Sequence, residues 1–385
     1  MVKKFLLIIL FAGNLAFSYD FSKIDSIVYS GISNKFYPCA QLIIGYNSDL
    51  IYEKSYGNLT YDENSEKLGD YHLFDLASVT KVVAATSAIM VLYENGKINL
   101  DEYAGTYLPE FSNNGKENIT VRNLLLHNSG LKAWIPFYQY YKTKEEVLSA
   151  IFNIAPVNKP GAKFVYSDLN AILLGLIVER VSGTTLDEFC IRNIFYPLGM
   201  KNTFFNPVEE KKKYCVPTEN DTYWRNKQLQ GEVHDEAASI LDGVSGNAGL
   251  FSTARDLFDF MRMMENKGFY YNPYTRGLKK ERLFKEETVD LFTSRAAGLN
   301  YLNTRALGWD TKPEPNKYRI PCGESFSDKC FGHTGYTGTS VWCDKDRHII
   351  VILLTNRVYP YRGNEGIKEI RPDLHNEIIS LLKNN

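Results

Sequence analysis

The chain has 385 residues, of which 44% are hydrophobic, 23% charged and 14% aromatic, an ordinary globular composition with enough apolar residues for a core. It contains 44 lysine and arginine residues against 45 aspartate and glutamate residues, so the formal net charge is −1. This balance argues against a nucleic-acid-binding protein. The length favours one large domain with an insertion, or two lobes.

The first eighteen residues have the features of a secretory signal peptide. Lys3 and Lys4 precede a short apolar stretch over 5–12, and Ala16-Phe17-Ser18 is an acceptable cleavage site. An uncleaved membrane anchor is the alternative, but the apolar stretch is short and Asn14 interrupts it. The sequence therefore predicts a secreted or periplasmic protein, cleaved near Ser18, with no further membrane span.

Cysteine usage leaves the redox state open. None of the cysteines forms a C-x-x-C pair, and an even number in an exported protein permits disulfides. Cys322 and Cys330 flank a polar loop and are candidates for a bridge, but free buried thiols are at least as compatible with the sequence. The six cysteines are Cys39, Cys190, Cys215, Cys322, Cys330 and Cys343.

The N-terminal half begins with a strand signal and continues with helix signals. Two β-rich runs, 39–45 and 50–56, are joined by Asn47-Ser48-Asp49, which predicts a hairpin. The stretch 79–94 is apolar on nearly every side and ends at Asn95-Gly96, which predicts a buried central helix. A helical pair over 169–181 and 186–195 follows.

The C-terminal half returns to strands. We expect loop over 205–230, an amphipathic helix over 254–264 and irregular chain over 270–280. A second hairpin is expected over 339–343 and 349–355, with a closing helix over 374–382.

Because the strands lie at both ends of the chain, we expect an α+β fold. An antiparallel sheet from both chain ends would be flanked by helices, with an inserted helical region. We expect one domain over 19–385, with a sheet lobe (about 22–105 plus 240–385) and a helical lobe (about 106–239). Ligand sites often lie at such a seam.

Ser78-x-x-Lys81, at the start of the expected buried helix, is the first candidate for chemistry. Residues three apart lie on one helix face, so a lysine amine there can activate a serine hydroxyl. One such pair is expected by chance in a chain of this size, and Ser78 alone could be an N-cap. Capping does not explain the lysine, whose burial we expect to depress its pKa and supply a base.

Two further segments are candidates for catalytic roles together with Ser78 and Lys81. Tyr166-Ser167-Asp168 lies in a turn that starts a helix. There Tyr166 could shuttle protons, or Ser167 or Asp168 could merely cap the helix. His333-Thr334-Gly335-Tyr336 leads into the late β-run. A free N–H group at this strand edge could complete an oxyanion hole together with the Ser78 backbone N–H. The alternative is that the glycine simply forms a turn.

Together the three segments resemble the serine β-lactamase and penicillin-binding protein superfamily. The similarity is to the branch of class C β-lactamases, D-alanyl-D-alanine carboxypeptidases and esterases, whose motifs are S-x-x-K, Y-x-N and K-T-G or H-T-G in that order. The segments 121–131, 198–200, 249–254 and 354–356 extend the resemblance. It implies a β-lactamase/transpeptidase-like fold and an acyl-enzyme, with no metal or organic cofactor.

The resemblance also implies roles. Ser78 would be the acylated nucleophile, Lys81 and Tyr166 would share acid–base work, and the Ser78 and Tyr336 amides would bind the oxyanion. Asp168 would stand where many members have asparagine and would hold Lys81 as an ammonium, which raises its pKa. His333 would replace the usual lysine beside Thr334 and Gly335, which weakens carboxylate recognition. The substrate-binding and oxyanion set is Asp168, His333, Thr334, Gly335 and Tyr336.

Other polar residues carry weaker signals. We interpret His234-Asp235-Glu236 as a possible wall of the site and not as a metal cluster, because adjacent residues do not converge on one ion. His127 is interpreted as structural. Arg357 is interpreted as a surface charge, with a carboxylate clamp as the alternative. Trp224 and Trp309 are interpreted as core or rim residues, with a place along the cleft as the alternative.

The leading hypothesis is an exported serine hydrolase. Its expected substrates are peptidoglycan-type D-amino acid peptides or small esters and amides, with weak or no β-lactamase activity and no nucleic-acid partner. The alternative is a catalytically slow penicillin-binding or cell-wall sensor protein of the same fold.

Overall fold

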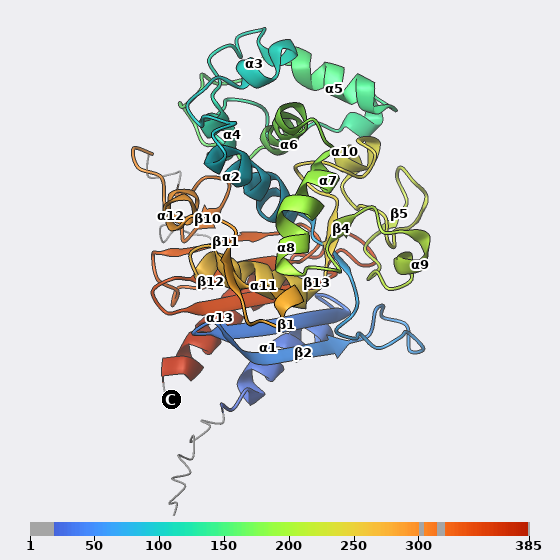
Figure 1. The fold of residues 1–385 in the computed structure, drawn as a ribbon. Coiled ribbons are helices and arrows are strands. Elements are labelled where there is room, and N and C mark those ends of the chain that lie inside the picture. Colours follow the sequence, from blue (N-terminus) through green and yellow to red (C-terminus); the bar gives the residue numbers. More distant parts are fainter. Residues whose placement is uncertain (1–18, 300–303, 314–319, 384–385) are drawn as a thin grey trace, which may run out of the picture.

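A six-stranded antiparallel sheet forms the centre of the fold in a computed structural model that describes residues 19–299, 304–313 and 320–383 (Figure 1). The expected signal segment, 1–18, lies outside the described residues. The strands run in the order β10-β11-β12-β13-β1-β2. Their bounds are β1 (Cys39–Tyr46), β2 (Asp49–Gly57), β10 (Asp310–Thr311), β11 (Cys330–Thr334), β12 (Ser340–Asp344) and β13 (Ile349–Thr355).

The two chain ends meet in this sheet. β1 pairs with β13, with Ala40 opposite Thr355 and Tyr46 opposite Ile349. The expected α+β fold, with an antiparallel sheet built from both ends of the chain, is therefore confirmed.

Short strands and helices complete the chain. The remaining strands are β3 (Phe74–Asp75), β4 (Phe204–Phe205), β5 (Asn220–Asp221), β6 (Lys227–Gln228), β7 (Leu250–Ser252), β8 (Phe269–Tyr271) and β9 (Lys280–Arg282). The α-helices are α1 (Ser22–Ser33), α2 (Ser87–Glu94), α3 (Ala104–Tyr107), α4 (Val121–Leu125), α5 (Lys144–Asn153), α6 (Asp168–Ser182), α7 (Leu186–Cys190), α8 (Tyr196–Leu198), α9 (Glu209–Lys212), α10 (Glu236–Ile240), α11 (Ala254–Glu265), α12 (Glu286–Thr293) and α13 (Ile367–Lys383).

Turn chemistry explains the hairpins. Asn47 and Ser48 both have positive φ, 51° and 67°, as a tight two-residue hairpin between β1 and β2 requires. The expected hairpin of β12 and β13 is also present. The expectation of irregular chain over 270–280 holds for its middle, 272–279, which has no strand, but is wrong at its two ends, where β8 and β9 pair from Phe269 opposite Arg282 onwards.

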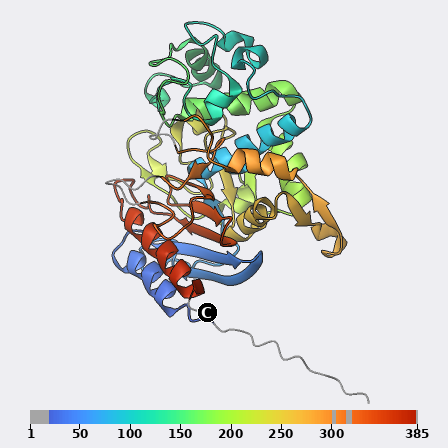
Figure 2. The same ribbon diagram turned by 90° about the vertical axis from the view of Figure 1, so that its left-hand side faces the viewer.

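Helices cover the sheet on both faces. α1 and α13 lie together on one side, where Ile24 and Val28 share a buried cluster with Leu374 and Ile378 (Figure 2). On the other side lie α11 and the central helical run, and beyond them α3, α4, α5 and α6 gather at the end of the molecule farthest from α1 and α13 (Figure 1).

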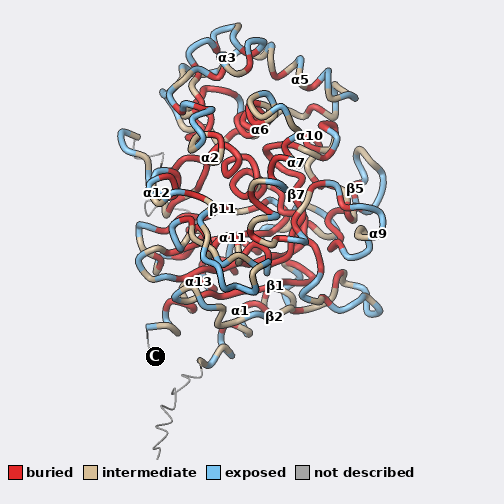
Figure 3. The backbone as a smooth tube through the Cα atoms, viewed as in Figure 1, coloured by how far each residue is buried: buried red, intermediate tan, exposed pale blue. Residues whose placement is uncertain are grey.

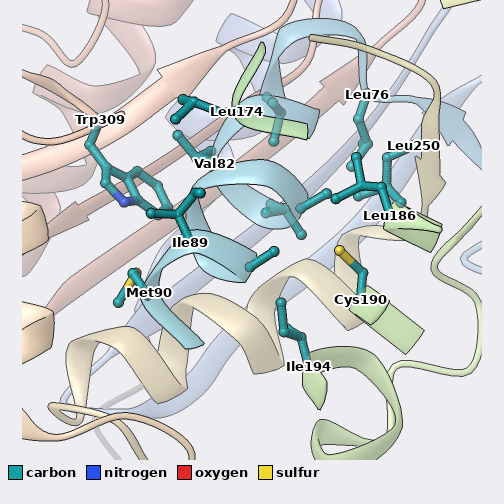
Figure 4. Packing of buried hydrophobic residues seen from close by; sticks show 14 of the residues in the cluster. Leu76, Val82, Ile89, Met90, Leu174, Leu186, Cys190, Ile194, Leu250 and Trp309 are labelled. Carbon is teal, nitrogen blue, oxygen red and sulfur yellow. The ribbon is translucent and has the colours of Figure 1, made fainter. Parts of the chain in front are cut away.

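The central helical run carries the predicted catalytic pair into the core. It consists of a 3-10 turn (Ala77–Val79), a π-helical segment (Lys81–Thr86) and α2. Val82, Ile89 and Met90 lie within the buried apolar cluster, which also includes Leu174 of α6 and Trp309 (Figures 3 and 4). Among the described residues, one helix, Ala77–Glu94, has the length and composition to span a membrane, and 78% of it is buried inside the protein. The predicted buried central helix is thus confirmed.

All six cysteines are buried and free. The sulfur atoms of Cys322 and Cys330 lie 3.7 Å apart, so the two residues are neighbours without being bridged. Of the two possibilities that the sequence left open, the structure has the free thiols.

Candidate active site

Ser78 lies just after a strained turn that leaves the short strand β3. Ala77 has a φ of 45°, which is uncommon for a residue with a side chain. Its backbone N–H donates to Asp75 Oδ1 at 2.8 Å, and the other oxygen of Asp75 accepts from the His234 backbone N–H at 2.6 Å. The buried Asp75 carboxylate therefore fixes the turn that presents Ser78 and ties it to the loop carrying His234.

Lys81 follows Ser78 on the same side of the helical run. Its Nζ lies 2.8 Å from Ser78 Oγ, 3.0 Å from the Asn247 backbone oxygen and 2.7 Å from Asp168 Oδ1. The side chain is only 3% exposed. An ammonium has three N–H donors and no acceptor, so these three oxygens satisfy it completely.

Two opposed expectations concern Lys81: that burial would lower its pKa, and that Asp168 would hold it as an ammonium. Burial lowers the pKa of Lys81, but the Asp168 carboxylate and Tyr166 outweigh it, so this pKa lies above its ordinary value. The expectation that burial would depress the pKa is therefore wrong, because Asp168 supplies a counter-charge in the same buried space. The expectation that Asp168 holds Lys81 as an ammonium is confirmed.

Tyr166 lies directly beside this pair. Lys81 Nζ is 5.1 Å from the centre of the Tyr166 ring. The phenolic oxygen is buried and has no hydrogen-bond partner of normal geometry among the described residues. Burial raises the pKa of Tyr166, and the nearby Lys81 charge opposes this, so the group is a neutral phenol at pH 7.

The segment after Tyr166 starts α6, as predicted, but no side chain caps that helix. Ser167 is the N-cap residue, yet its hydroxyl donates to the Lys132 backbone oxygen at 2.6 Å. Asp168 is paired with Lys81. The capping alternative is therefore wrong. His127 is structural, as interpreted, because its Nδ1 accepts from the Ser167 backbone N–H at 3.0 Å.

Strand β11 and the turn after it form the opposite wall. Thr337 and Thr339 donate their hydroxyls to the backbone oxygens of Asp75 and Leu76, at 2.7 and 2.9 Å. A Cβ atom on Gly335 would lie 2.4 Å from the Leu76 oxygen, so only glycine allows this approach. The Tyr336 backbone N–H has no acceptor in the described part of the chain. The turn is thus held against the segment that leads into Ser78.

His333 is buried in β11 and is a neutral imidazole at pH 7. Its pKa is lowered to about 4 by burial, with the charges of Arg305 and Lys81 adding to the effect and Asp310 opposing it. Its Nδ1 lies 2.8 Å from the Thr334 backbone oxygen. His333 therefore does not supply the fixed positive charge of a lysine at this position.

Arginines lie near that position. A pocket of about 500 Å³ on the β11 side of Ser78 is lined by Arg305, Arg357 and Arg371, together with His333. Asp310, which pairs with Arg305, and Glu365, which pairs with Lys368, line the same pocket. Arg357 is only 7% exposed, and its Nε donates to the Tyr336 backbone oxygen at 2.7 Å, so its interpretation as a surface charge is wrong. Burial lowers the pKa of Arg371 to about 9, and the Arg357 charge adds to this.

A second cleft, of about 370 Å³, opens on the other side of Ser78. The predicted wall residues His234, Asp235 and Glu236 line it, as do Tyr166 and Asp168. Its remaining lining residues are Ala77, Ser78, Trp134, Ala248, Tyr336 and Arg362. No cluster of metal-ligating side chains occurs within the ranges that the structure describes.

The structure thus brings Ser78, Lys81, Tyr166, Asp168 and the turn after β11 to one place. Sequence reasoning missed three supporting residues, Asp75, Asn247 and Arg371. Each contacts the site through backbone atoms or from a distant helix, so no local pattern marks it. Trp309, by contrast, is fully buried, as its interpretation as a core or rim residue allowed.

A family model described as beta-lactamase matches residues 28–371, most of the chain. The chain belongs to the β-lactamase family. Relatives that are more than 30% identical include an amidase and a carboxypeptidase. An N-acetylmuramyl-L-alanine amidase of Bacillus subtilis is 34% identical over 367 residues, covering 87% of this chain and 80% of the relative. A protein of Escherichia coli provisionally named a D-alanyl-D-alanine carboxypeptidase is 33% identical over 355 residues, covering 83% and 79%.

Solved structures of this family share the fold. A penicillin-binding protein homologue from Caulobacter crescentus superposes with a TM-score of 0.72 at 19% identity, covering 94% of this chain and 97% of that one. With the family match, these relatives identify the β-lactamase-family chain as a serine hydrolase.

Proposed function

We propose that this chain is an exported hydrolase that forms an acyl-enzyme at Ser78 and cleaves peptidoglycan-type amides. One observation carries the proposal: Ser78 Oγ lies 2.8 Å from Lys81 Nζ where two clefts meet. The buried Tyr166 hydroxyl and the turn after β11 lie on either side. A nucleophile, acid–base groups and a free backbone N–H at one point are what acyl transfer requires.

The chemistry proceeds in two halves. In the fraction of the enzyme whose Lys81 has released its proton to solvent, Ser78 Oγ attacks the carbonyl carbon and its proton passes to the Lys81 amine, directly or through the Tyr166 hydroxyl. The new C–O bond gives an oxyanion held by the Ser78 and Tyr336 amides. The bond to the leaving nitrogen then breaks as that nitrogen takes the proton. Water next adds to the acyl carbon, the bond to Ser78 breaks and the serine recovers its proton.

The relatives and the arginine pocket support the substrate class. The names of the two relatives refer to an N-acetylmuramyl-L-alanine amide and to D-alanyl-D-alanine. Arg357 and Arg371, which form no ion pair with a carboxylate among the described residues, would receive a carboxylate of the leaving group on the β11 side. A neutral His333 cannot supply that charge. The signal-like features of residues 1–18 support export to the cell wall, where such substrates lie.

Hydrolysis of a small panel tests this function. The panel comprises N-acetylmuramyl-L-alanine, a peptide ending in D-alanyl-D-alanine, p-nitrophenyl acetate and a fluorescent penicillin. Turnover of a panel amide with release of the free amine supports the proposal. A persistent penicillin adduct without turnover of any substrate would instead support the slow penicillin-binding alternative, and neither adduct nor turnover would contradict both.

Asp168→Asn is expected to move the pH dependence of acylation. Asp168 raises the pKa of Lys81, so its removal lets the lowering effect of burial dominate, and the amine loses its proton at lower pH. If neutral Lys81 is the base, the rising limb of kcat/KM shifts to lower pH. Each unit of lowered pKa increases the neutral fraction about tenfold at pH values well below the pKa. The measurement is kcat/KM for p-nitrophenyl acetate from pH 5 to 10.

Asp168→Glu is the matched control, because it keeps the negative charge near Lys81 and should keep the rising limb closer to its original position. An unshifted limb in Asp168→Asn would show that another group acts as the base.

A further inference from the structure

The cleft on the side of Ser78 away from the arginine pocket has an aromatic rim. Trp134 and Tyr336 both line it and are 46% and 48% exposed, and Tyr223, next to its Glu236 and Arg362 wall, is 45% exposed. Large aromatic faces left open beside a nucleophile are binding surfaces more often than packing defects. Trp134 lines the cleft with nearly half of its surface exposed, so part of the indole is open to a ligand.

The other rings of the rim are held in place by neighbouring groups. Tyr336 lies between the His234 ring, 5.8 Å away, and the Arg357 guanidinium, 4.4 Å from its centre. Arg362 lies 4.8 Å from the centre of the Tyr223 ring. A rigid aromatic wall costs little entropy on binding, which favours recognition of a flat face of a ligand.

The polar groups of this cleft favour a neutral ligand rich in hydroxyl groups. Asp168 is paired with Lys81 at 2.7 Å. Glu236 lies 3.0 Å from Arg362, a guanidinium that it shares with Glu219 at 2.6 Å. Asp235 Oδ1 accepts from the Ala238 backbone and the Asn247 side chain, at 2.8 and 3.0 Å, whereas its Oδ2 has no hydrogen bond among the described residues. One open acceptor and a guanidinium donor suit hydroxyl and amide groups.

Two other ligand classes fit less well. A cationic acyl group would face the Arg362 guanidinium, which lines the same cleft, and Asp168 already has Lys81 as its counter-charge. A purely apolar acyl group would leave Asp235 and Arg362 desolvated without new partners, which is costly. A pyranose ring suits both the aromatic rim and the polar groups of the cleft. Its C–H face stacks on an aromatic ring, while its hydroxyl groups form hydrogen bonds with polar groups such as Asp235 and Arg362.

We propose that the Trp134 cleft binds the pyranose ring of a sugar whose side chain carries the carbonyl that Ser78 attacks. This deepens the proposed function and rests on it. In such a substrate the sugar belongs to the acyl group and the peptide belongs to the leaving group. The two clefts divide the substrate accordingly: the ring lies over Trp134 and Tyr336, and the anionic peptide lies toward Arg357 and Arg371. Trp134 and Asp235 are then determinants of specificity for muramyl-type amides over purely peptidic ones.

Trp134→Ala tests the proposal through a ratio of substrates. We expect kcat/KM for N-acetylmuramyl-L-alanine to fall at least about fivefold more than kcat/KM for p-nitrophenyl acetate, whose acyl group is a bare acetyl with no sugar ring to stack on Trp134 and whose aromatic ring belongs to the leaving group. Trp134→Phe keeps an aromatic face and should recover most of the difference. Tyr271→Ala removes a 62% exposed tyrosine on the hairpin of β8 and β9, outside the site, and should change neither substrate. Equal losses with both substrates would overturn the proposal.

Direct binding separates this proposal from the proposed hydrolase function. Calorimetry with N-acetylmuramic acid and the Ser78→Ala protein measures ring binding without any chemistry. Binding that Trp134→Ala weakens, even if the panel shows no turnover, would support the sugar site while the hydrolase proposal failed. Turnover of a panel amide without binding of the sugar would do the reverse. Preference for an acyl donor bearing an ammonium group, lost in Asp235→Asn, would show a cation site and overturn the sugar proposal.

Discussion

Replacing Ser78 with alanine is expected to abolish labelling by a fluorophosphonate probe and to lower kcat/KM for every substrate by at least about four orders of magnitude. The physical reason is that Ser78 supplies the aliphatic hydroxyl that Lys81 Nζ contacts, at 2.8 Å, where the two clefts meet; Nζ also contacts a backbone oxygen at 3.0 Å and the Asp168 carboxylate at 2.7 Å. The folded state should be little affected, because the substitution removes one hydrogen bond, worth about 1 kcal/mol.

Ser87→Ala is the matched control for this experiment. Ser87 lies on the same helical run, is buried, and donates to the Val82 backbone oxygen at 2.8 Å, far along the helix from the clefts. Its alanine variant should label normally. Labelling of Ser78→Ala at the wild-type rate, measured by gel fluorescence and intact mass, would exclude Ser78 as the nucleophile.

Lys81→Ala is expected to lower the acylation rate by about 10²–10⁴-fold, the usual contribution of a general base. Two losses combine in this variant. The amine that takes the Ser78 proton is gone, and Asp168 loses the partner that lies 2.7 Å away. The second loss should lower the melting temperature, because it leaves a carboxylate unpaired at the wall of the cleft.

Lys81→Arg separates these two effects. A guanidinium keeps the positive charge beside Asp168 but stays protonated at any working pH, so it cannot act as a base. We expect Lys81→Arg to recover part of the melting temperature without recovering the acylation rate, measured by stopped flow with p-nitrophenyl acetate. A fast Lys81→Arg variant would show that the lysine acts through its charge, and that Tyr166 or water takes the proton.

Local patterns were sufficient for most of the architecture. The Asn47-Ser48 turn, the apolar run ending at Glu94 and the strands at both chain ends predicted the sheet and its central helix. The prediction of irregular chain over 270–280 was wrong at the ends of that stretch, where the aromatic and basic composition concealed the pairing of β8 with β9. Short strands of this kind have too few residues for an alternating pattern to become visible.

The site was predicted in part, and the errors have one physical cause. Ser78, Lys81 and Tyr166 belong to recognisable motifs, and the structure places them together. The charge state of Lys81 and the burial of Arg357 depend on groups from other segments, and neither can be inferred from the neighbours of a residue in sequence. The neutral state of His333 likewise depends on burial, with a further contribution from Arg305 and Lys81.

The sequence by itself determined which residues are capable of the chemistry and the order in which they occur, because motifs and hydrophobic periodicity are local properties. Only the tertiary structure decided that Asp168 keeps Lys81 protonated at rest, and that arginines line the pocket beside a neutral His333. It also decided that Ser78 lies between a basic pocket and an aromatic cleft. Electrostatic interactions and burial act between segments distant in the chain, so they become definite only when the fold brings those segments together.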